Sequence, residues 1–290
     1  MTNYIITTDC ACDLPLSIAE ELGLVVLPLT LNIDDKSYAC NLNEGEISAK
    51  KFYAMMREGK IASTSAINAA TTMQFLEPLL QEGYDILHLA FSSGLSSTYN
   101  STVAAVQELR ERYPQRKIYS LDTLCASLGQ GLLVYLAAQK RLAGCSIEEV
   151  VDYVEEIKLN ICHWFTVDDL SYLRRGGRLS AASAVVGTVL NVKPVLHAND
   201  EGRLENVCKV RGRKKSLQAL YKELENSAID ISEQTVFISH GDCLEDAELL
   251  AAMIKDNLGA KQVIINYIGP VIGVHSGPGT VALFFVGEKR

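Results

Sequence analysis

The chain has 290 residues, of which 48% are hydrophobic and 21% charged, and this composition predicts a folded protein because a chain so apolar can bury a continuous core. Its 27 basic and 35 acidic residues give a net charge of −8, which opposes binding to nucleic-acid phosphates and to anionic lipid surfaces. The sequence has neither the pattern of a secretory leader nor a run of 18 apolar residues. We therefore expect a soluble cytoplasmic protein without stable membrane insertion, divided by its length into two domains.

Short apolar runs alternate with helical patterns through the first 160 residues, and this alternation is typical of a parallel sheet flanked by helices. In chain order the sequence predicts a strand at 4–9, a helix at 15–22, a strand at 24–33, helices at 47–57 and 67–81, a strand at 84–91, a helix at 96–112, a strand at 117–123 and two long helices ending near 160. Residues 1–160 are the expected N-terminal α/β domain.

After residue 160 the pattern changes to strand-like runs separated by short turns, which indicates a mixed sheet. Strands are expected at 163–169, 193–200, 204–211, 234–242, 262–270 and 280–288. Helices at 181–190, 213–226 and 244–257 are expected to cover one face of this sheet. Residues 161–290 are the predicted C-terminal α/β domain.

Eight cysteines are scattered along the chain without a CxxC pair, so a disulfide framework is not expected. Cys10 and Cys12 stand beside Asp9 and Asp13, which raises the alternative of a metal or redox site. Two close thiols need further ligands that the local sequence does not supply. The sequence favours buried thiols here, and neither a metal site nor a cofactor is predicted.

Residues 88–102, HLAFSSGLSSTYNST, join a strand to a helical pattern through a run of serines. The carboxyl end of a parallel strand and the helix start after it offer free N–H groups, so an anion is the expected guest. Capping of the helix by Ser96 or Ser97 is the structural alternative. A second hydroxyl cluster, Ser63-Thr64-Ser65, also stands ahead of a helical pattern, and two such clusters favour a site for one carboxylate.

A catalytic role for these serines would require an activated nucleophile. The hydrolase elbow G-x-S-x-G is absent, because the segment 94–98 reads Gly-Leu-Ser-Ser-Thr, and no phosphate-binding loop of the nucleotide-binding type is present. His275, in the glycine-rich segment GVHSGPG, is the best candidate base. A lone histidine is as often a satisfied hydrogen-bonding residue, and the residues alone leave both interpretations open.

Two basic segments stand out in this acidic chain. YLRRGGRLS, residues 172–180, either presents Arg174, Arg175 or Arg178 to an anionic partner or simply ends a helix, where glycine and arginine are favoured. The run from Arg211 to Lys215 is either a solvated helix start or a docking patch. Both alternatives remain open for each segment.

Several motifs occur together in one order: the acids 9 and 13 after the first strand, Thr64-Ser65, SSGLSSTYN, LRRGGRLS followed by KPVL, and HSGPGTVALFF. In that order and spacing they resemble the DegV family of bacterial fatty-acid-binding proteins over nearly the whole chain. The resemblance implies two α/β domains and one long-chain fatty acid in a buried tunnel, its carboxylate near the domain junction. The positions that match the family's head-group residues are Thr64, Ser96 and His275, with the neighbouring Ser65 and Ser97.

The resemblance also implies a partner, a fatty acid kinase that phosphorylates the presented carboxylate to an acyl phosphate used in phospholipid synthesis. It points to Arg211, and with it Arg178, as kinase contacts. Departures from the family pattern are Ala66-Ile67 in place of Gln-Pro, Ser97 in place of glycine, and Cys10 in place of a hydroxyl residue. They leave the head-group residues in place and affect the expected shape of the tunnel.

The prediction from these observations is a carrier of long-chain fatty acids, acting in lipid transport or fatty acid metabolism, and not an enzyme. The alternatives are a serine-dependent lipid hydrolase, a phosphotransferase acting alone, or a regulatory module that binds another small acid.

Overall fold

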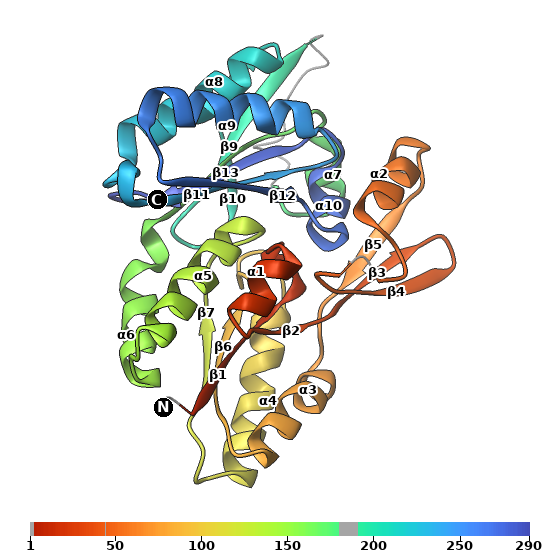
Figure 1. Ribbon diagram of the computed structural model, residues 1–290. Coiled ribbons are helices and arrows are strands. Elements are labelled where there is room, and N and C mark those ends of the chain that lie inside the picture. The colour runs from red at the N-terminus through yellow and green to blue at the C-terminus, as the bar shows by residue number, and fades with distance from the viewer. Residues whose placement is uncertain (1–2, 44, 180–190) are drawn as a thin grey trace.

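The first half of the chain contains a four-stranded parallel sheet with helices on both faces (Figure 1). The computed structural model describes residues 3–43, 45–179 and 191–290. In sheet order the strands are β2 (Val25–Leu27), β1 (Tyr4–Asp9), β6 (Asp85–Ala90) and β7 (Ile118–Asp122). Because helices cover both faces of such a sheet, its strands have continuous apolar sequences. The predicted helix-flanked parallel sheet is confirmed.

Each face of this sheet packs against its own pair of helices. Ile86 and Ile118 face α3 (Ala69–Gln81) and α4 (Thr98–Arg112), whereas Leu87 and Leu89 face α5 (Leu128–Leu142) and α6 (Ile147–Ile157). This half also contains the short helix α1 (Leu16–Glu21) and the 3₁₀ turns η1 (Cys10–Cys12) and η2 (Lys158–Asn160). Serine or asparagine side chains cap the starts of α3 and α6, the latter through a reciprocal capping box between Ser146 and Glu149.

A small antiparallel sheet that the sequence analysis did not predict stands beside the parallel one (Figure 1). Its strands are β4 (Lys36–Cys40), β3 (Leu29–Ile33) and β5 (Ala62–Ser65), and α2 (Ala49–Arg57) packs against it. Pro28 divides the apolar run 24–33 into β2 and β3, because proline cannot donate to a strand ladder. β5 has the sequence ASTS, without apolar alternation, and pairs antiparallel with β3.

The second half of the chain contains a six-stranded mixed sheet, as predicted. In sheet order its strands are β10 (Leu204–Arg211), β9 (Val192–Ala198), β8 (Ile161–Thr166), β13 (Val281–Val286), β11 (Thr235–His240) and β12 (Gln262–Tyr267). One face is covered by α8 (Arg213–Ser227) and α9 (Leu244–Leu258), which confirms two predicted helices, and η3 (Ile231–Glu233) precedes β11. The helix expected at 181–190 lies outside the described residues.

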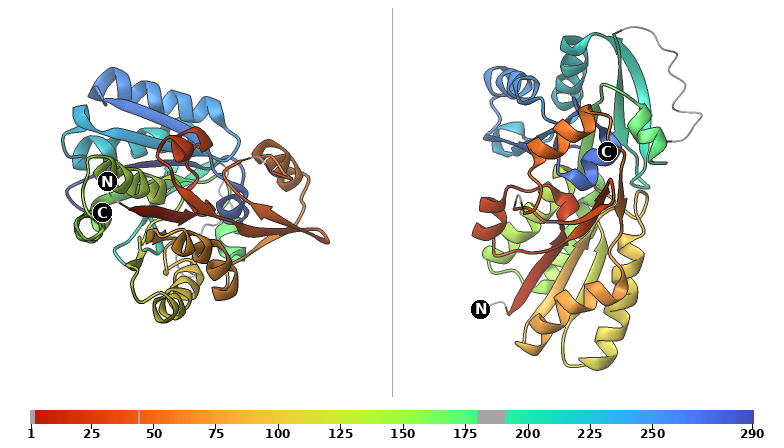
Figure 2. Two further views of the ribbon diagram at one scale, coloured as in Figure 1. Left: turned by 60° about the horizontal axis from the view of Figure 1, so that its bottom comes forward. Right: turned by 90° about the vertical axis from the view of Figure 1, so that its right-hand side faces the viewer.

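The other face of this sheet packs against α5, so α5 lies between the two large sheets (Figures 1 and 2). Two short helices, α7 (Ser171–Arg175) and α10 (Pro270–Ser276), lie where the small sheet approaches the six-stranded one. One apolar core therefore continues across the two halves, and the domain boundary at residue 160 stays a prediction. None of the helices in the described ranges combines the length and apolar character needed to span a membrane.

Candidate functional site

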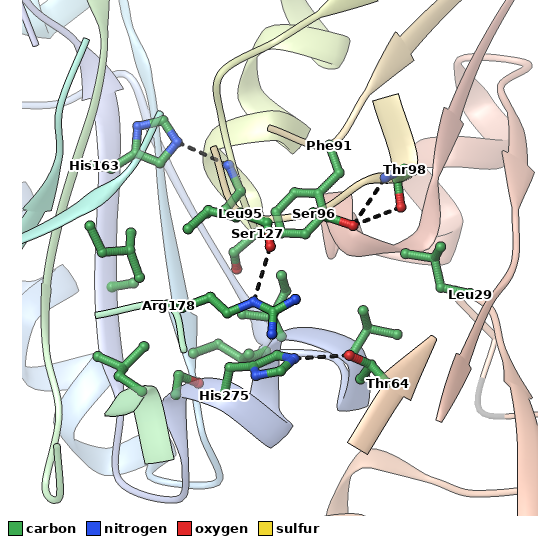
Figure 3. A pocket seen from close by; sticks show the side chains of 18 of the residues that line it. Leu29, Thr64, Phe91, Leu95, Ser96, Thr98, Ser127, His163, Arg178 and His275 are labelled. Carbon is green, nitrogen blue, oxygen red and sulfur yellow. Dashed lines mark hydrogen bonds between the residues drawn. The ribbon is translucent and has the colours of Figure 1, made fainter. Parts of the chain in front are cut away.

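A cavity of about 270 Å³ opens among the small sheet, the carboxyl end of the parallel sheet and the inner face of the six-stranded sheet (Figure 3). Small-molecule sites commonly occupy clefts of roughly 300–1,000 Å³, so this one is small and suited to a slender ligand. Most of its wall is aliphatic or aromatic, and the members of that apolar wall include Leu29, Phe91, Leu95, Phe165, Leu173, Ile268, Val271 and Phe284.

The two ends of the cavity differ in polarity and in exposure. Ser65, Ala66 and Ser97 are exposed lining residues, so the mouth lies beside them. At the other end, His163 and Phe284 are only 4% and 3% exposed. The cavity therefore has a solvent-facing polar end and a closed, buried end.

Thr64 and His275 meet at the polar end, although 211 positions separate them in the sequence. Thr64 Oγ1 and His275 Nε2 lie 2.9 Å apart, at hydrogen-bond distance. Thr64 lies on strand β5, which ends at Ser65 ahead of helix α3, as expected. His275 lies in the last turn of α10, a helix that the glycine-rich sequence did not predict. The structure thus brings these two predicted site residues into direct contact.

His275 is held as a neutral ring. Burial, and after it the positive charge of Arg178, lower its pKa to about 4. Its Nδ1 atom is buried and has no hydrogen-bond partner among the described residues. A Cβ on Gly176 would lie 2.3 Å from that atom, so the glycine of LRRGGR leaves room for the imidazole.

Arg178 supplies the positive charge of the polar end (Figure 3). Its Nε donates to the Leu95 carbonyl oxygen at 3.0 Å, and Nη1 donates to the carbonyl of Gly176. No acidic side chain of residues 3–43, 45–179 or 191–290 forms an ion pair with it, and burial lowers its pKa. A half-buried cation without an acidic partner favours an anionic ligand.

The serine loop after β6 forms the next part of the polar end. Ser96 Oγ lies 2.9 Å from Thr98 Oγ1 and accepts a hydrogen bond from the Thr98 N–H at 3.2 Å. Ser96 thus contributes to the start of α4, the expected structural role, and lines the cavity as well. A Cβ on Gly94 would lie 2.6 Å from the Glu201 carbonyl oxygen, so the turn between β9 and β10 fixes this loop.

Asp13 lies behind the cavity and joins several segments around it. Its carboxylate accepts hydrogen bonds from Ser127 Oγ at 2.6 Å and from the Gly269 N–H at 2.9 Å, just before α10. Ser127 lines the cavity with a left-handed φ of 52°, which is strained for a residue with a side chain. Burial raises the pKa of Asp13 to about 7 and that of the nearby Asp9 to about 6.

A sequence profile described as "Uncharacterised protein, DegV family" matches residues 3–288. The chain belongs to the DegV family. A DegV domain-containing protein of Clostridium perfringens is 48% identical over 290 residues, which is 100% of this chain and 99% of that protein. A structure described as fatty acid binding of a DegV family protein from Thermus thermophilus is 30% identical with a TM-score of 0.88, covering 99% of this chain and 100% of its own. A DegV lipid-binding protein of Thermotoga maritima is likewise 30% identical with a TM-score of 0.88, and the match covers 100% of both chains.

In this DegV chain, six of the seven predicted site residues line this cavity, namely Thr64, Ser65, Ser96, Ser97, His275 and Arg178. Arg211 does not line it and is exposed at the end of β10. Its neighbour Arg213 forms ion pairs with Asp168 and Asp246, so part of the basic run is structural. The contact with a kinase predicted for Arg178 stays a prediction, and its position faces the cavity.

The structure also tests the sequence-based expectations for the cysteines and for the arginines of α7. Cys10 and Cys12 are buried as predicted, and burial raises the pKa of both thiols. Arg174 and Arg175 end α7, which confirms the helix-end interpretation for these two. Sequence reasoning missed His163 and Phe165 in the cavity wall. The only available signal was their two-residue spacing in a strand, which places both on one face.

Proposed function

We propose that this chain binds one long-chain fatty acid with its carboxylate at the polar end of the cavity, and carries it without altering it chemically. The observation that supports this most is Arg178, a half-buried cation with no acidic partner in the described ranges, at the polar end of a cavity whose wall is mostly apolar. A carboxylate complements its charge and an acyl chain complements the wall. DegV structures described as fatty-acid-binding agree with this ligand class.

The energetics favour an acyl chain over a short acid. Each buried methylene contributes about 0.8 kcal/mol, so a chain of a dozen methylenes supplies on the order of 10 kcal/mol before ordering costs. Besides the charge of Arg178, the head group then needs hydrogen-bonding groups. Thr64, Ser96 and the neutral His275 are hydrogen-bonding groups of that kind. A small acid, as the ligand of a regulatory site, would not contact most of the apolar residues that line the cavity.

Carriage without catalysis is part of the proposal. A serine hydrolase needs a histidine within hydrogen-bond reach of its nucleophile. Within the described part of the chain, His275 bonds a threonine and His163 bonds two backbone groups, and no histidine bonds a serine hydroxyl. This arrangement supports a carrier more than the hydrolase alternative.

Replacement of Thr64 by valine tests the head-group assignment. Valine keeps the shape of the side chain and removes one hydrogen bond to an anion, which is worth roughly 1.5–3 kcal/mol, so fatty-acid affinity is expected to fall between tenfold and about 150-fold. Native mass spectrometry of the purified protein, followed by equilibrium displacement of a fluorescent fatty acid, measures occupancy and affinity. Thr30→Val on the neighbouring strand β3 is the matched control and should bind like the parent. Equal affinities in all three proteins would contradict the assignment.

The finer part of the proposal is delivery to a fatty acid kinase. The carboxylate end is the solvent-facing end, which suits a ligand whose head group is phosphorylated by a partner. Transient encounters of this type use charge complementarity for rate and orientation. Arg211, Lys214 and Lys215 are exposed cations on a chain of net charge −8.

Arg211→Ala is therefore expected to leave fatty-acid affinity unchanged and to slow acyl-phosphate formation several-fold when a fatty acid kinase and ATP are supplied. Docking by charge predicts that the rate falls with ionic strength for the parent, and less steeply for the variant. Lys222→Ala, an exposed cation farther along α8, is the control. Equal rates and equal salt dependences for Arg211→Ala and the parent would remove Arg211 from the docking surface.

A further inference from the structure

We propose that His163 is the end wall of the cavity and sets the length of acyl chain that fits, with Gly129 determining where the ring stands. This inference rests on the proposed function and adds a specificity-determining residue at the end opposite the carboxylate.

The strand register shows how the cavity deepens. β8 and β13 run antiparallel with Phe165 opposite Ala282 and His163 opposite Phe284, and all four side chains line the cavity. From the polar end near Thr280, a ligand passes the Phe165–Ala282 pair and then reaches the His163–Phe284 pair. One step deeper, Ile161 is fully buried in the core and no longer lines the cavity.

The ring of His163 is fixed from three sides. Its Nδ1 donates to the Ile161 carbonyl oxygen at 2.8 Å, and its Nε2 accepts from the Ala126 N–H at 3.3 Å (Figure 3). These two bonds require a neutral ring with its proton on Nδ1, and burial lowers the pKa of His163 well below the usual range. Phe284 packs edge-on against it, with ring centroids 5.3 Å apart and an interplanar angle of 86°.

Gly129 stands directly behind this ring, on the first turn of α5. A Cβ at this position would lie 2.1 Å from Nε2 of His163 and 2.5 Å from its Cδ2. The backbone of Gly129 is helical and tolerates other residues, so the glycine is needed for space and not for conformation. A side chain at position 129 would displace the imidazole ring of His163, and the ring has free space only toward the cavity.

A fixed end wall has a measurable consequence for ligand choice. Each methylene added to a buried chain strengthens binding about fourfold until the terminal methyl reaches the wall, because 0.8 kcal/mol corresponds to that factor. Beyond that length the added carbons must buckle or push the head group out. Affinity plotted against chain length therefore rises, then stops rising at a length that the ring position defines.

The test is that plot for five proteins, measured by competition with a homologous series of saturated fatty acids. His163→Asn keeps an amide near Nδ1 for the Ile161 carbonyl and removes the outer part of the ring, so the maximum should move to longer chains by one methylene or more. Gly129→Ala should move it to shorter chains. Two matched controls should leave it unchanged: His88→Asn, a buried histidine bonded to Thr7 outside the cavity, and Gly131→Ala, whose Cβ would meet the Cys12 carbonyl and not the ligand.

Opposite shifts of the two cavity variants, with unmoved controls, support the inference. Unmoved maxima in His163→Asn and Gly129→Ala, in a parent that binds fatty acids, overturn the inference and leave the proposed function intact. If Gly129→Ala does not fold, the shift in His163→Asn alone decides the result. A parent that retains no member of the series contradicts the proposed function, and the inference with it.

Discussion

Arg178→Gln is expected to weaken fatty-acid binding by at least a hundredfold. Removing one partner of a buried, hydrogen-bonded charge pair typically costs about 3–5 kcal/mol, because the remaining charge stays buried without compensation. Arg178 is half-buried, so we expect the lower end of that range. In the complex, the ligand carboxylate would be that remaining charge. Glutamine still reaches the Leu95 carbonyl as a donor, so the cavity wall should keep its shape.

The decisive measurement compares each fatty acid with the alcohol of the same chain length. The parent should prefer the acid strongly, Arg178→Gln should bind both about equally, and Arg178→Lys should keep most of the preference because the charge remains. Arg175→Gln, on the exposed side of α7, is the matched control. An Arg178→Gln protein that still prefers the acid as strongly as the parent would show that the charge acts elsewhere.

The stability of Asp13→Asn relative to the parent is expected to rise with pH. Burial raises the folded-state pKa of Asp13 from 3.8 to about 7, so between these values the native state holds a proton that the unfolded state has lost. Parent stability attributable to Asp13 therefore decreases as pH rises through this window and is fully lost above it. At about 1.4 kcal/mol per pH unit, the total is on the order of 4 kcal/mol.

Urea denaturation of both proteins at intervals between pH 4 and about pH 8 measures this difference. Buried neutral histidines, such as His88 with a pKa near 4, contribute slopes of opposite sign that are common to both proteins and cancel in the difference. Asp9→Asn should show the same sign, with its rise ending about one pH unit lower. A difference profile that is flat across the window would mean that hydrogen bonds from Ser127 and Gly269 offset the burial of Asp13 completely.

The parallel sheet and most helices could be predicted because their residues carry strong local patterns. Apolar runs such as that of β6 and capping residues such as Ser146 specify structure within a short window. The small sheet could not be predicted in this way. The strand β5, with the sequence ASTS, has no apolar periodicity, and its pairing with β3 comes from tertiary structure. α10 contains Gly273, has a glycine on either side of it and reads as a loop, but Phe52 and Tyr53 of α2 pack so closely on Gly273 that a Cβ there would clash.

The candidate site was predictable in its residues and not in its geometry. Hydroxyl groups near helix starts indicated Thr64 and Ser96, and the family pattern added His275. Arg178 carried two equal interpretations, since sequence alone does not say whether an arginine after a Gly-Gly pair faces solvent or a cavity. The closed end could not be predicted, because it depends on the contact between His163 of β8 and Gly129 of α5, which no local sequence pattern indicates.

The cavity draws on both ends of the chain, and this has a consequence for biosynthesis. Strands β1, β2, β6 and β7 end by Asp122, whereas β13 pairs with β8 across more than a hundred residues and His275 comes just before it. Translation proceeds at about 5–20 residues per second, so Thr64 and Ser96 leave the ribosome many seconds before His275. Throughout that interval the apolar wall lacks one side. The cavity is therefore incomplete until the final strand is in place, and its apolar wall is exposed during that time.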